Sequence, residues 1–211
     1  MTTPSPAEAL LAQSRLVPVL TIDRVEDAVP LARALVAGGI TTLEITLRTA
    51  AAPAAIEAIA AAVPEAVIGL GTVLTPADLE LGLKLGARFA LSPGATPELL
   101  DAAASLGLPF IPGIATASEL MAAMQRGFRA VKFFPAVPAG GIPALKALGA
   151  PFPMVRFCPT GGIGEEQAAE WLALPNVLAV GGSWLAPPAL MRAGQWDAIT
   201  DIARRSLARL P

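Results

Sequence analysis

The sequence of 211 residues contains no histidine and no tyrosine. The missing histidine excludes Ser-His-Asp and Cys-His nucleophilic machinery, as well as every metal site built on imidazole ligands. The missing tyrosine excludes a phenolic acid or base. The single cysteine, Cys158, cannot form an intramolecular disulfide, and a reducing compartment is expected. Acid–base chemistry therefore has to come from carboxylates, a lysine amine, Cys158 or a bound water.

The chain has no strong excess of charge, with 15 Lys and Arg residues against 17 Asp and Glu residues. A nucleic-acid-binding protein is expected to carry a clustered basic excess, so this class is disfavoured. The longest apolar stretch, residues 50–74, is broken by two prolines and two glutamates, which is not typical of a membrane-spanning helix. The N-terminus lacks a basic segment followed by an apolar one, so no signal peptide is predicted. We therefore expect a soluble, cytoplasmic protein.

Short apolar runs recur along the chain at a nearly constant spacing, with helical segments between them. Eight runs are predicted as strands, at residues 17–22, 42–47, 67–73, 89–92, 110–114, 130–134, 155–159 and 177–180. Strands that alternate with helices form right-handed β-α-β units and a parallel sheet. Eight units predict an α/β protein with the (β/α)8 TIM barrel fold, as one domain over residues 1–211. A doubly wound open sheet is the alternative, but the expected glycine-rich turn after the first strand is missing.

Several helix starts are marked by a capping side chain that stands three residues before a carboxylate. These pairs are Ser5–Glu8, Asp23–Glu26, Thr75–Asp78 and Thr116–Glu119. Ser5 is followed by Pro6, which suits the first position of a helix. The pattern therefore predicts an extra N-terminal helix before the first strand.

Lys132, one of only three lysines, departs most clearly from the apolar pattern. In the strand of residues 130–134, a period of two places Val131 and Phe133 on one face and Lys132 and Phe134 on the other. A cation directed into a barrel interior is costly unless it is used. Lys132 is either a structural residue, paired with a carboxylate or extended to solvent, or the nucleophile of a Schiff base.

A polar stripe runs along the strand of residues 42–47. Glu44 shares a face with Arg48, and the alternate positions on the other face are apolar. A polar face in a central strand has to pair internally or face a polar cavity. Glu44 and Arg48 are therefore either a structural ion pair, or a general acid/base and an anion clamp at the mouth of the strand.

Glycine pairs follow the last two predicted strands, at Gly161-Gly162 and at Gly181-Gly182. Glycine lets backbone N–H groups approach an anion, and the late loops of a barrel commonly bind phosphate. Two such loops on adjacent strands predict a phosphate site, whereas either alone is equally typical of a tight turn. Cys158 has apolar flanks and is interpreted as a small core residue.

A buried lysine, a carboxylate, an arginine clamp and a phosphate site are together typical of a class I aldolase. The lysine forms an imine with a ketone, the imine acts as an electron sink, and the carboxylate moves protons. A 2-keto acid joined to a phosphorylated aldehyde fits this set, and the chemistry needs no metal and no organic cofactor.

Six motifs occur in order along the chain. They are Leu43-Glu-Ile-Thr-Leu-Arg48, Gly69-Leu-Gly-Thr-Val73, Ile111-Pro-Gly113, Val131-Lys-Phe-Phe-Pro135, Arg156-Phe-Cys-Pro-Thr-Gly-Gly-Ile163 and Gly181-Gly-Ser-Trp184. Together they closely resemble the bacterial 2-keto-3-deoxy-6-phosphogluconate (KDPG) aldolases, which also act as 4-hydroxy-2-oxoglutarate (KHG) aldolases. The resemblance covers the chain from about residue 17 to residue 184.

The resemblance implies a role for ten residues. Lys132 would form the Schiff base, and Glu44 would be the acid/base. The substrate-binding residues would be Arg48 and Thr72 for the pyruvyl carboxylate, Pro93 and Phe134 around the pyruvyl part, Thr160 beside the strand of Lys132, and Gly161, Gly162 and Ser183 for the phosphate. The resemblance also implies a homotrimer whose small-molecule partners are a keto acid and a phosphorylated aldehyde.

Three other functions stay open on the sequence. An aldolase for the galactonate-series epimer is one, because the residues do not set the stereochemical preference at C4. A phosphate-binding barrel with non-covalent isomerase or synthase chemistry is another, and there Lys132 would stay unmodified during turnover. A non-catalytic sugar-phosphate-binding protein is the third, and it would release no pyruvate.

Overall fold

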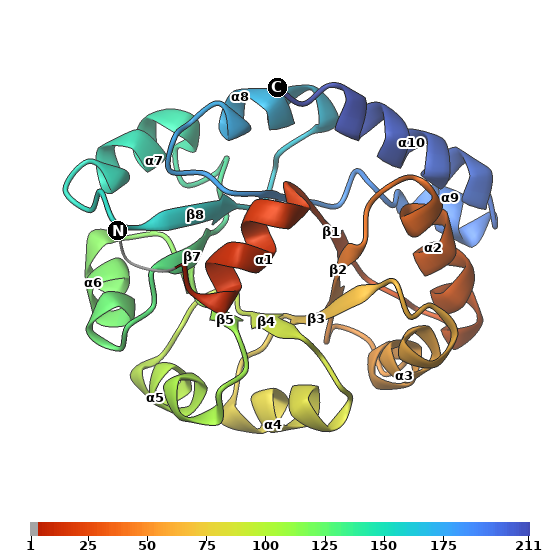
Figure 1. Cartoon of the computed structure of the whole chain (residues 1–211), viewed down its shortest axis with the longest axis horizontal. Helices are drawn as coiled ribbons and strands as arrows, with labels where there is room; N and C mark the ends of the chain where they lie inside the picture. Colours follow the sequence, from red (N-terminus) through yellow and green to blue (C-terminus); the bar gives the residue numbers. More distant parts are fainter. Residues whose placement is uncertain (1–3) are drawn as a thin grey trace.

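The strands of this protein lie at the centre of the molecule, and helices surround them (Figure 1). The structure is a computed structural model that describes residues 4–211. The strands are β1 (Leu16–Leu20), β2 (Thr42–Thr46), β3 (Val67–Gly71), β4 (Phe89–Leu91), β5 (Phe110–Ile111), β6 (Gly113–Ile114), β7 (Ala130–Phe133), β8 (Arg156–Pro159) and β9 (Val180–Gly182). All of their pairings are parallel, so the predicted α/β class is confirmed.

The strands are divided between two sheets. One has six strands in the order β5-β4-β3-β2-β1-β9, and the other has three in the order β6-β7-β8. Isolated bridges from Phe157 to Val177 and from Thr160 to Gly181 link β8 to the segment that contains β9. Sequential strands are neighbours within each sheet, as consecutive β-α-β units require.

Six of the predicted strands agree with the observed ones to within two residues at each end, and the other two differ in a way that has a structural reason. The strand predicted at 110–114 is interrupted at Pro112, which separates β5 from β6 because proline has no N–H for the ladder. The last strand was expected at 177–180 and this is wrong, since β9 is Val180–Gly182. The register explains the shift, because Val180–Gly182 pairs with residues 16–18 of β1. Pairing with β1 therefore determines which residues form β9, and the apolar run at residues 177–180 does not.

Ten α-helices connect or flank the strands in the described part of the chain. They are α1 (Pro6–Ser14), α2 (Val25–Ala37), α3 (Ala52–Ala62), α4 (Pro76–Lys84), α5 (Pro97–Leu106), α6 (Ala117–Gln125), α7 (Gly141–Gly149), α8 (Ala168–Leu172), α9 (Pro188–Arg192) and α10 (Trp196–Ala208), with a 3-10 turn at Glu165–Gln167. Among residues 4–211, none of these helices has both the length and the apolar character to cross a membrane.

Three of the four predicted capping boxes are confirmed. Ser5, Thr75 and Thr116 each accept a hydrogen bond from the backbone N–H three residues on, and the carboxylate at that position bonds back to the cap. The prediction at Asp23 is wrong, because α2 begins one residue later with Arg24 at the cap and no side-chain bond. The Arg24 guanidinium instead pairs with Asp27 inside the first turn, at 2.6 Å from Nη2 to Oδ1.

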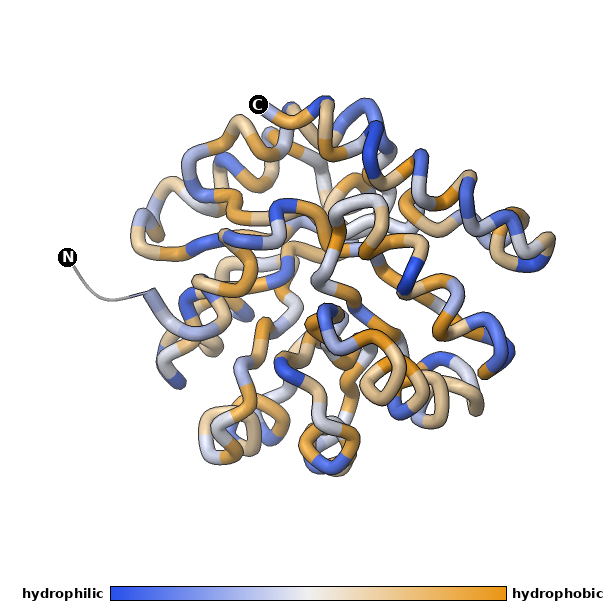
Figure 2. The backbone as a smooth tube through the Cα atoms, turned by 45° about the vertical axis from the view of Figure 1, so that its right-hand side comes forward, coloured by the Kyte–Doolittle hydropathy of each residue, from blue (hydrophilic) through white to orange (hydrophobic). Residues whose placement is uncertain are grey.

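Alternate residues of the strands face two different apolar layers. Leu43, Ile45, Val131 and Phe133 are buried in the layer between the strands and the helices. In the tube view, hydrophobic segments gather in the interior and hydrophilic segments lie on the outer helical turns (Figure 2). Burying these side chains contributes about 25 cal/mol for each Å² of apolar surface removed from water. The residues between them on each strand face inward, where the site is built.

Helix α1 lies across one end of the strands (Figure 1). Its Ala7 and Leu11 belong to a separate buried cluster. The strand and loop residues of that cluster are Val17, Phe89, Leu91, Ile111, Ala130, Cys158 and Ala179. Phe89 and Ala130 are the first residues of their strands, so α1 covers the amino end. The predicted N-terminal helix is thereby confirmed, and it keeps the apolar interior out of water.

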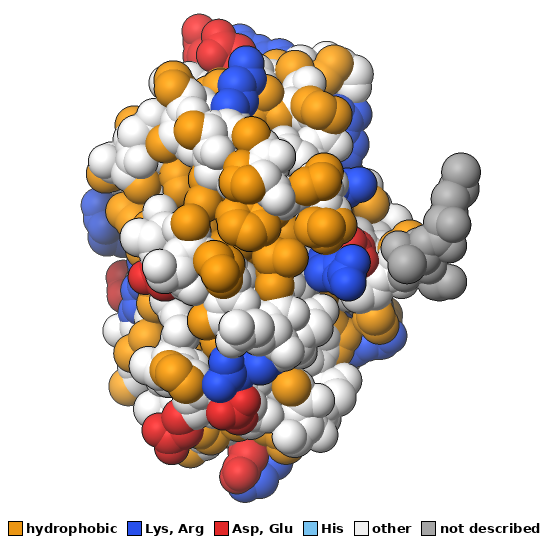
Figure 3. Space-filling model, turned by 90° about the vertical axis from the view of Figure 1, so that its left-hand side faces the viewer, with side chains coloured by type: hydrophobic (Ala, Val, Ile, Leu, Met, Phe, Trp, Pro, Cys, Tyr) orange, Lys and Arg blue, Asp and Glu red, His pale blue; other side chains and the backbone are white. Residues whose placement is uncertain are grey.

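One outer face of the molecule carries a concentration of hydrophobic side chains. Figure 3 shows them over the part of the surface formed by α6 and α7. Met121 of α6 is 52% exposed, and Val137 and Met154, on either side of α7, are 40% and 43% exposed. Large apolar surfaces of this kind are typical of interfaces between proteins.

Candidate active site

Lys132 is held inside the molecule by the alternation of β7. Its neighbours Val131 and Phe133 pack outward toward the helices, so Lys132 points inward and only 3% of it is exposed. In register, Lys132 lies beside Gly113 of β6 and Cys158 of β8. The inward orientation predicted for Lys132 is therefore confirmed.

Glu44 reaches the same interior from β2. Its carboxylate Oε1 accepts a hydrogen bond from Lys132 Nζ at 2.8 Å, although the two residues are 88 positions apart. The side chains are 1% and 4% exposed, so the two charges are almost fully desolvated. Of the structural alternatives, Lys132 pairs with a carboxylate, whereas no ion pair joins Glu44 to Arg48 in the described residues. Removing one partner of a buried ion pair typically costs about 3–5 kcal/mol.

The second carboxylate oxygen of Glu44 distinguishes this pair from a purely structural one. Oε2 is buried, and no hydrogen-bond donor within residues 4–211 reaches it. Leaving such an acceptor unpaired costs about 1–3 kcal/mol, and more for a charged group. Oε1 thus contacts the amine, while Oε2 is available to a hydroxyl group brought by a ligand.

Arg48 and Thr72 lie together at the carboxyl ends of β2 and β3. Arg48 Nε donates to Thr72 Oγ1 at 3.0 Å, and the arginine is exposed. Thr72 has a φ of 59°, which places a β-branched residue in the left-handed region. A conformation of this kind costs about 1–3 kcal/mol and is concentrated at functional sites.

A cavity of about 110 Å³ opens at the carboxyl ends of the strands. It is lined by Val19, Arg48, Phe134, Thr160, Gly161, Gly162, Ile163, Gly182 and Ser183. Phe134 joins the cavity to the ion pair, because its ring centroid is 5.5 Å from Lys132 Nζ. Six of the ten predicted site residues therefore meet around one space, with the lysine and glutamate beneath it.

Comparison with known proteins identifies the family. The model of the KDPG and KHG aldolase family matches residues 7–202. The chain belongs to the KDPG and KHG aldolase family. The KHG/KDPG aldolase of Escherichia coli (strain K12) is 51% identical over 201 residues, which make up 95% of this chain and 94% of that protein. The resemblance derived from the six motifs is thereby confirmed.

Solved structures of aldolases have the same fold. The KDPG aldolase of Legionella pneumophila has a TM-score of 0.93 and 48% identity, with 96% of this chain and 98% of that chain covered. In that crystal structure, pyruvate is captured at low pH as a covalent carbinolamine intermediate. The aldolase of Zymomonas mobilis ZM4, solved with 3-phosphoglycerate, has a TM-score of 0.88 and 40% identity over 95% of this chain and 94% of that chain.

The glycine loop of this aldolase has the backbone geometry expected of an anion site. Gly161 and Gly162 have φ values of 102° and 81°, in the region that favours glycine. Within residues 4–211, neither of their N–H groups donates to a protein acceptor. The segment that follows the loop is a 3-10 turn, Glu165–Gln167, and then the five-residue α8.

Some predicted residues lie apart from the cavity, and some lining residues were missed. Pro93 stands at the end of β4 and does not line the space, although a side chain on Gly113, beside Lys132, would meet its carbonyl. The hydroxyl oxygen of the buried Ser92, next to Pro93, accepts a hydrogen bond from Gly113 N at 3.1 Å. Val19 and Ile163 were missed because apolar residues carry no chemical signal in a sequence. No three His, Cys, Asp or Glu side chains of the described chain gather into a metal site.

Cys158 lies beside Lys132 in the sheet and is completely buried. Burial raises the pKa of its thiol to about 12. Only the thiolate is a good nucleophile, so this cysteine is unreactive near neutral pH. Its interpretation as a small core residue agrees with this environment.

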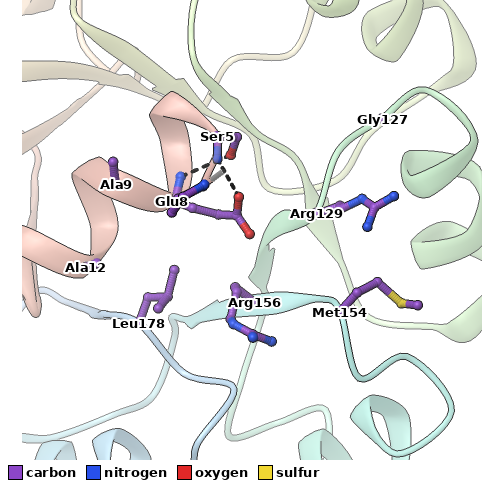
Figure 4. A pocket seen from close by; sticks show the side chains of 10 residues that line it. Ser5, Glu8, Ala9, Ala12, Gly127, Arg129, Met154, Arg156 and Leu178 are labelled. Carbon is purple, nitrogen blue, oxygen red and sulfur yellow. Dashed lines mark hydrogen bonds between the residues drawn. The ribbon is translucent and has the colours of Figure 1, made fainter. Parts of the chain in front are cut away.

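A larger cavity of about 620 Å³ lies at the amino ends of β7 and β8, beneath α1 (Figure 4). Glu8, Arg129 and Arg156 project into it, and the Glu8 carboxylate already accepts from Ser5 N at 2.6 Å. Among the residues that the structure describes, neither a lysine nor a buried carboxylate lines it. The smaller cavity at the carboxyl ends, with the desolvated amine below it, is therefore the candidate active site of this aldolase.

Proposed function

We propose that this chain is a class I aldolase that cleaves KDPG to pyruvate and glyceraldehyde 3-phosphate, and that it also acts on 4-hydroxy-2-oxoglutarate. The observation that carries the proposal is the contact of 2.8 Å between the Lys132 amine and the Glu44 carboxylate, both buried. A primary amine beside a carboxylate in a site shielded from water is suited to imine formation and proton transfer.

Lys132 is the nucleophile. Its neutral amine attacks C2 of the keto acid to form a carbinolamine, and loss of water yields a protonated imine. The carbinolamine of the Legionella relative supports the first of these steps. Glu44 accepts the proton of the C4 hydroxyl as the C3–C4 bond breaks, and the electron pair of that bond moves toward the iminium nitrogen. The products of this step are the aldehyde and an enamine.

Glu44 also serves the second half of the reaction. The enamine is protonated at C3 by Glu44, directly or through a water, and hydrolysis of the imine releases pyruvate and regenerates Lys132. The two carboxylate oxygens suit these duties, because Oε1 contacts the amine while Oε2 has no partner among the described residues. Oε2 is the oxygen that would meet the C4 hydroxyl.

The pyruvyl end of the substrate is held at the mouth of β2 and β3. Arg48 binds the carboxylate through its guanidinium, and its hydrogen bond to Thr72 supports this orientation. Phe134 packs against the pyruvyl part, consistent with its ring position 5.5 Å from Lys132 Nζ. Pro93 contributes to the wall from the end of β4.

The phosphate is held at the opposite side of the cavity. Gly161 and Gly162 offer backbone N–H groups, Ser183 offers its hydroxyl, and Thr160 contacts the substrate between the phosphate and Lys132. Their shared lining of one cavity supports this assignment. The relative solved with 3-phosphoglycerate supports a phosphorylated ligand.

The chain architecture is proposed to be a closed (β/α)8 barrel formed by one domain over residues 1–211. Two bridges between β8 and the β9 segment, and the adjacency of β5 and β6 in sequence, support closure of the two sheets into one ring. The active site then lies at the carboxyl ends of the strands, as in other barrels of this class.

The assembly is proposed to be a homotrimer in the cytoplasm. The exposed apolar residues on the face of α6 and α7, among them Met121 and Val137, support an interface there (Figure 3). Light scattering coupled to size exclusion would give about three times the chain mass of 21.5 kDa for a trimer. A single chain mass at micromolar concentration would contradict the assembly without affecting the aldolase assignment.

Trapping with borohydride tests the covalent mechanism. The protein is incubated with pyruvate and borohydride, and intact and peptide masses are measured. One reduced pyruvate adduct on Lys132, missing when pyruvate is left out, is the expected result. No adduct on a folded protein that still binds phosphate would favour a non-covalent isomerase or a binding protein. Comparing turnover of the C4 epimers then separates the gluconate series from the galactonate series.

A further inference from the structure

Strand β3 presents two inward-facing positions that have no side chain, Gly69 and Gly71. In both, a side chain from a neighbouring strand fills the space that a β-carbon would occupy. At Gly69 this space is filled by the ring of Phe89 from β4. At Gly71 it is filled by the side chain of Glu44 from β2. The two glycines are thus alike in their packing, but the nearest atoms belong to an aromatic ring at Gly69 and to Glu44 at Gly71.

The space at Gly71 is occupied by the reacting end of Glu44. A β-carbon at Gly71 would lie 2.5 Å from Glu44 Oε1, 2.6 Å from Cγ and 3.0 Å from Cδ. Real β-carbons essentially never approach other atoms closer than 3.0 Å. The backbone does not require glycine here, because Gly71 is not among the residues with positive φ. Room for the carboxylate is therefore the physical reason for glycine at this position.

The oxygen that a β-carbon would displace is the one that accepts from Lys132 Nζ at 2.8 Å. From this we infer that Gly71 is a positioning residue for catalysis, because its missing side chain sets where Glu44 places its carboxylate against Lys132. The inference rests on the proposed role of Glu44 as acid/base. It assigns Gly71 no contact with the substrate.

An added methyl group at this position is expected to move Glu44, not the strand. Gly71 is paired in register with Thr46, and its carbonyl accepts from Leu47 N at 2.9 Å, so its backbone is held in place. The Glu44 carboxylate lies at the end of a side chain with rotatable bonds, so it can be displaced more easily than the hydrogen-bonded backbone of Gly71. A displacement of about 1 Å at a reacting group can lower the rate by about 100-fold.

Gly71→Ala is the first test, with Gly69→Ala as the matched control on the same face of the same strand. Turnover is expressed per active site titrated with pyruvate and borohydride, at a temperature where both variants are folded. We expect Gly71→Ala to lower kcat by about 100-fold and to shift the pH profile of kcat. Gly69→Ala crowds the buried Phe89 ring, so it is expected to lower Tm while leaving that pH profile unchanged.

A double-mutant cycle with Glu44→Ala identifies the contact itself. Alanine ends at Cβ, so neither the Cγ atom nor the carboxylate that a β-carbon at Gly71 would meet remains in that space. We expect Gly71→Ala to lower kcat by less than about 3-fold in the Glu44→Ala background, against about 100-fold in the native background. Equal losses in the two backgrounds, or an unchanged pH profile in Gly71→Ala, would overturn the inference. If Gly71→Ala lowers Tm sharply, a smaller loss of Tm from the same change in the Glu44→Ala background supports the contact, and an equal loss overturns it.

The outcomes also separate this inference from the proposed function. If the unmodified protein gives no Lys132 adduct and no cleavage, the aldolase proposal itself fails. If the unmodified protein gives both, and Gly71→Ala is as active as the native protein, only the role of Gly71 is contradicted.

Discussion

The two ends of the strands carry cavities that differ in size and in chemistry. The amino end has about 620 Å³ lined by Glu8, Arg129 and Arg156, while the carboxyl end has only about 110 Å³. The smaller space lies over a buried lysine and glutamate in direct contact. Volume measures open space, whereas reactivity comes from charges that the fold desolvates and brings together.

The difference follows from what faces inward at each end. Near the amino end the inward residues are apolar, among them Val17, Phe89 and Ala130, and Leu11 of α1 covers them. Toward the carboxyl end the inward residues are polar, as with Glu44 and Lys132. The amino end therefore stabilises the fold, and the carboxyl end holds the reactive groups. Parallel strands make this division possible, because all of their carboxyl ends lie on the same side of the molecule.

Removing the Lys132 amine should reduce turnover more than any other change at the carboxyl end. Lys132→Ala is expected to lower kcat by about 10⁴-fold or more and to abolish the borohydride adduct, because no other lysine within residues 4–211 is buried. Lys132→Arg is the matched control, since it keeps a cation beside Glu44 but cannot form an imine. Near-native turnover in either variant would contradict the Schiff-base mechanism.

Loss of the carboxylate should come next. Glu44→Gln keeps the shape of the side chain but cannot accept a proton, so kcat is expected to fall by about 10²–10⁴-fold. Adduct formation with pyruvate should be partly retained, since Lys132 is still present. Measuring kcat against pH checks the assignment, and a profile identical to that of the native protein would show that another group moves the protons.

Loss of the anion clamp should affect binding more than chemistry. Arg48→Ala removes the guanidinium that would face the substrate carboxylate, and a charge-assisted hydrogen bond contributes about 1.5–3 kcal/mol. We therefore expect KM to rise by about 10–100-fold with a smaller change in kcat. Thr72→Val, which removes the hydroxyl that accepts from Arg48, should give a weaker form of the same effect. Unchanged KM in Arg48→Ala would place the carboxylate elsewhere.

The buried thiol provides a test of desolvation that is separate from activity. Burial raises the pKa of Cys158 to about 12, so the folded state holds this proton more tightly than the unfolded chain does. The free energy of unfolding should therefore be unaffected by this group below about pH 8.5 and fall above it by up to about 1.4 kcal/mol per pH unit. Denaturant unfolding at several alkaline pH values measures the slope, and Cys158→Ala should reduce it. A thiol reagent should modify the native protein at neutral pH only after unfolding, so rapid modification of the folded protein would contradict this environment.

The smallest effect is expected at the amino end. Arg129 is exposed and forms no ion pair in the described residues, so Arg129→Ala should change stability by no more than about 0.5 kcal/mol. Turnover and KM should stay within 2-fold of the native values, because the reacting groups lie at the other end of the strands. A large loss of activity would show that the two ends are coupled.

Local patterns predicted the elements well where one short-range rule acts alone. The capping boxes at Ser5, Thr75 and Thr116 follow from two side chains three residues apart, and all three are present. The prediction at Asp23 failed because α2 begins one residue later than the pattern placed it, with Arg24 at the cap. The bounds of β9 failed because pairing with β1, which is distant in the chain, decides which residues join the sheet.

The candidate site was predictable in its members more than in its arrangement. The period of two marked Lys132 and Glu44 as inward polar residues, and the order of the motifs supplied the others. The hydrogen bond between Arg48 and Thr72, and the positive φ of Thr72, depend on how two loops meet and have no signal in the sequence. The role inferred for Gly71 could not be predicted either, since the sequence of a strand does not show which neighbouring side chain will fill the space beside a glycine.

The sequence by itself determined the chemistry that was available. With no histidine, no tyrosine and three lysines, an inward-facing Lys132 and an inward-facing Glu44 were the natural acid–base partners. Only the tertiary structure decided that these two groups meet at 2.8 Å, that Glu44 Oε2 stays unpaired among the described residues, and that Gly71 leaves room for the carboxylate. The reason is physical: backbone alternation sets the direction of a side chain locally, but the distance between β2 and β7 depends on how the whole array of strands curls.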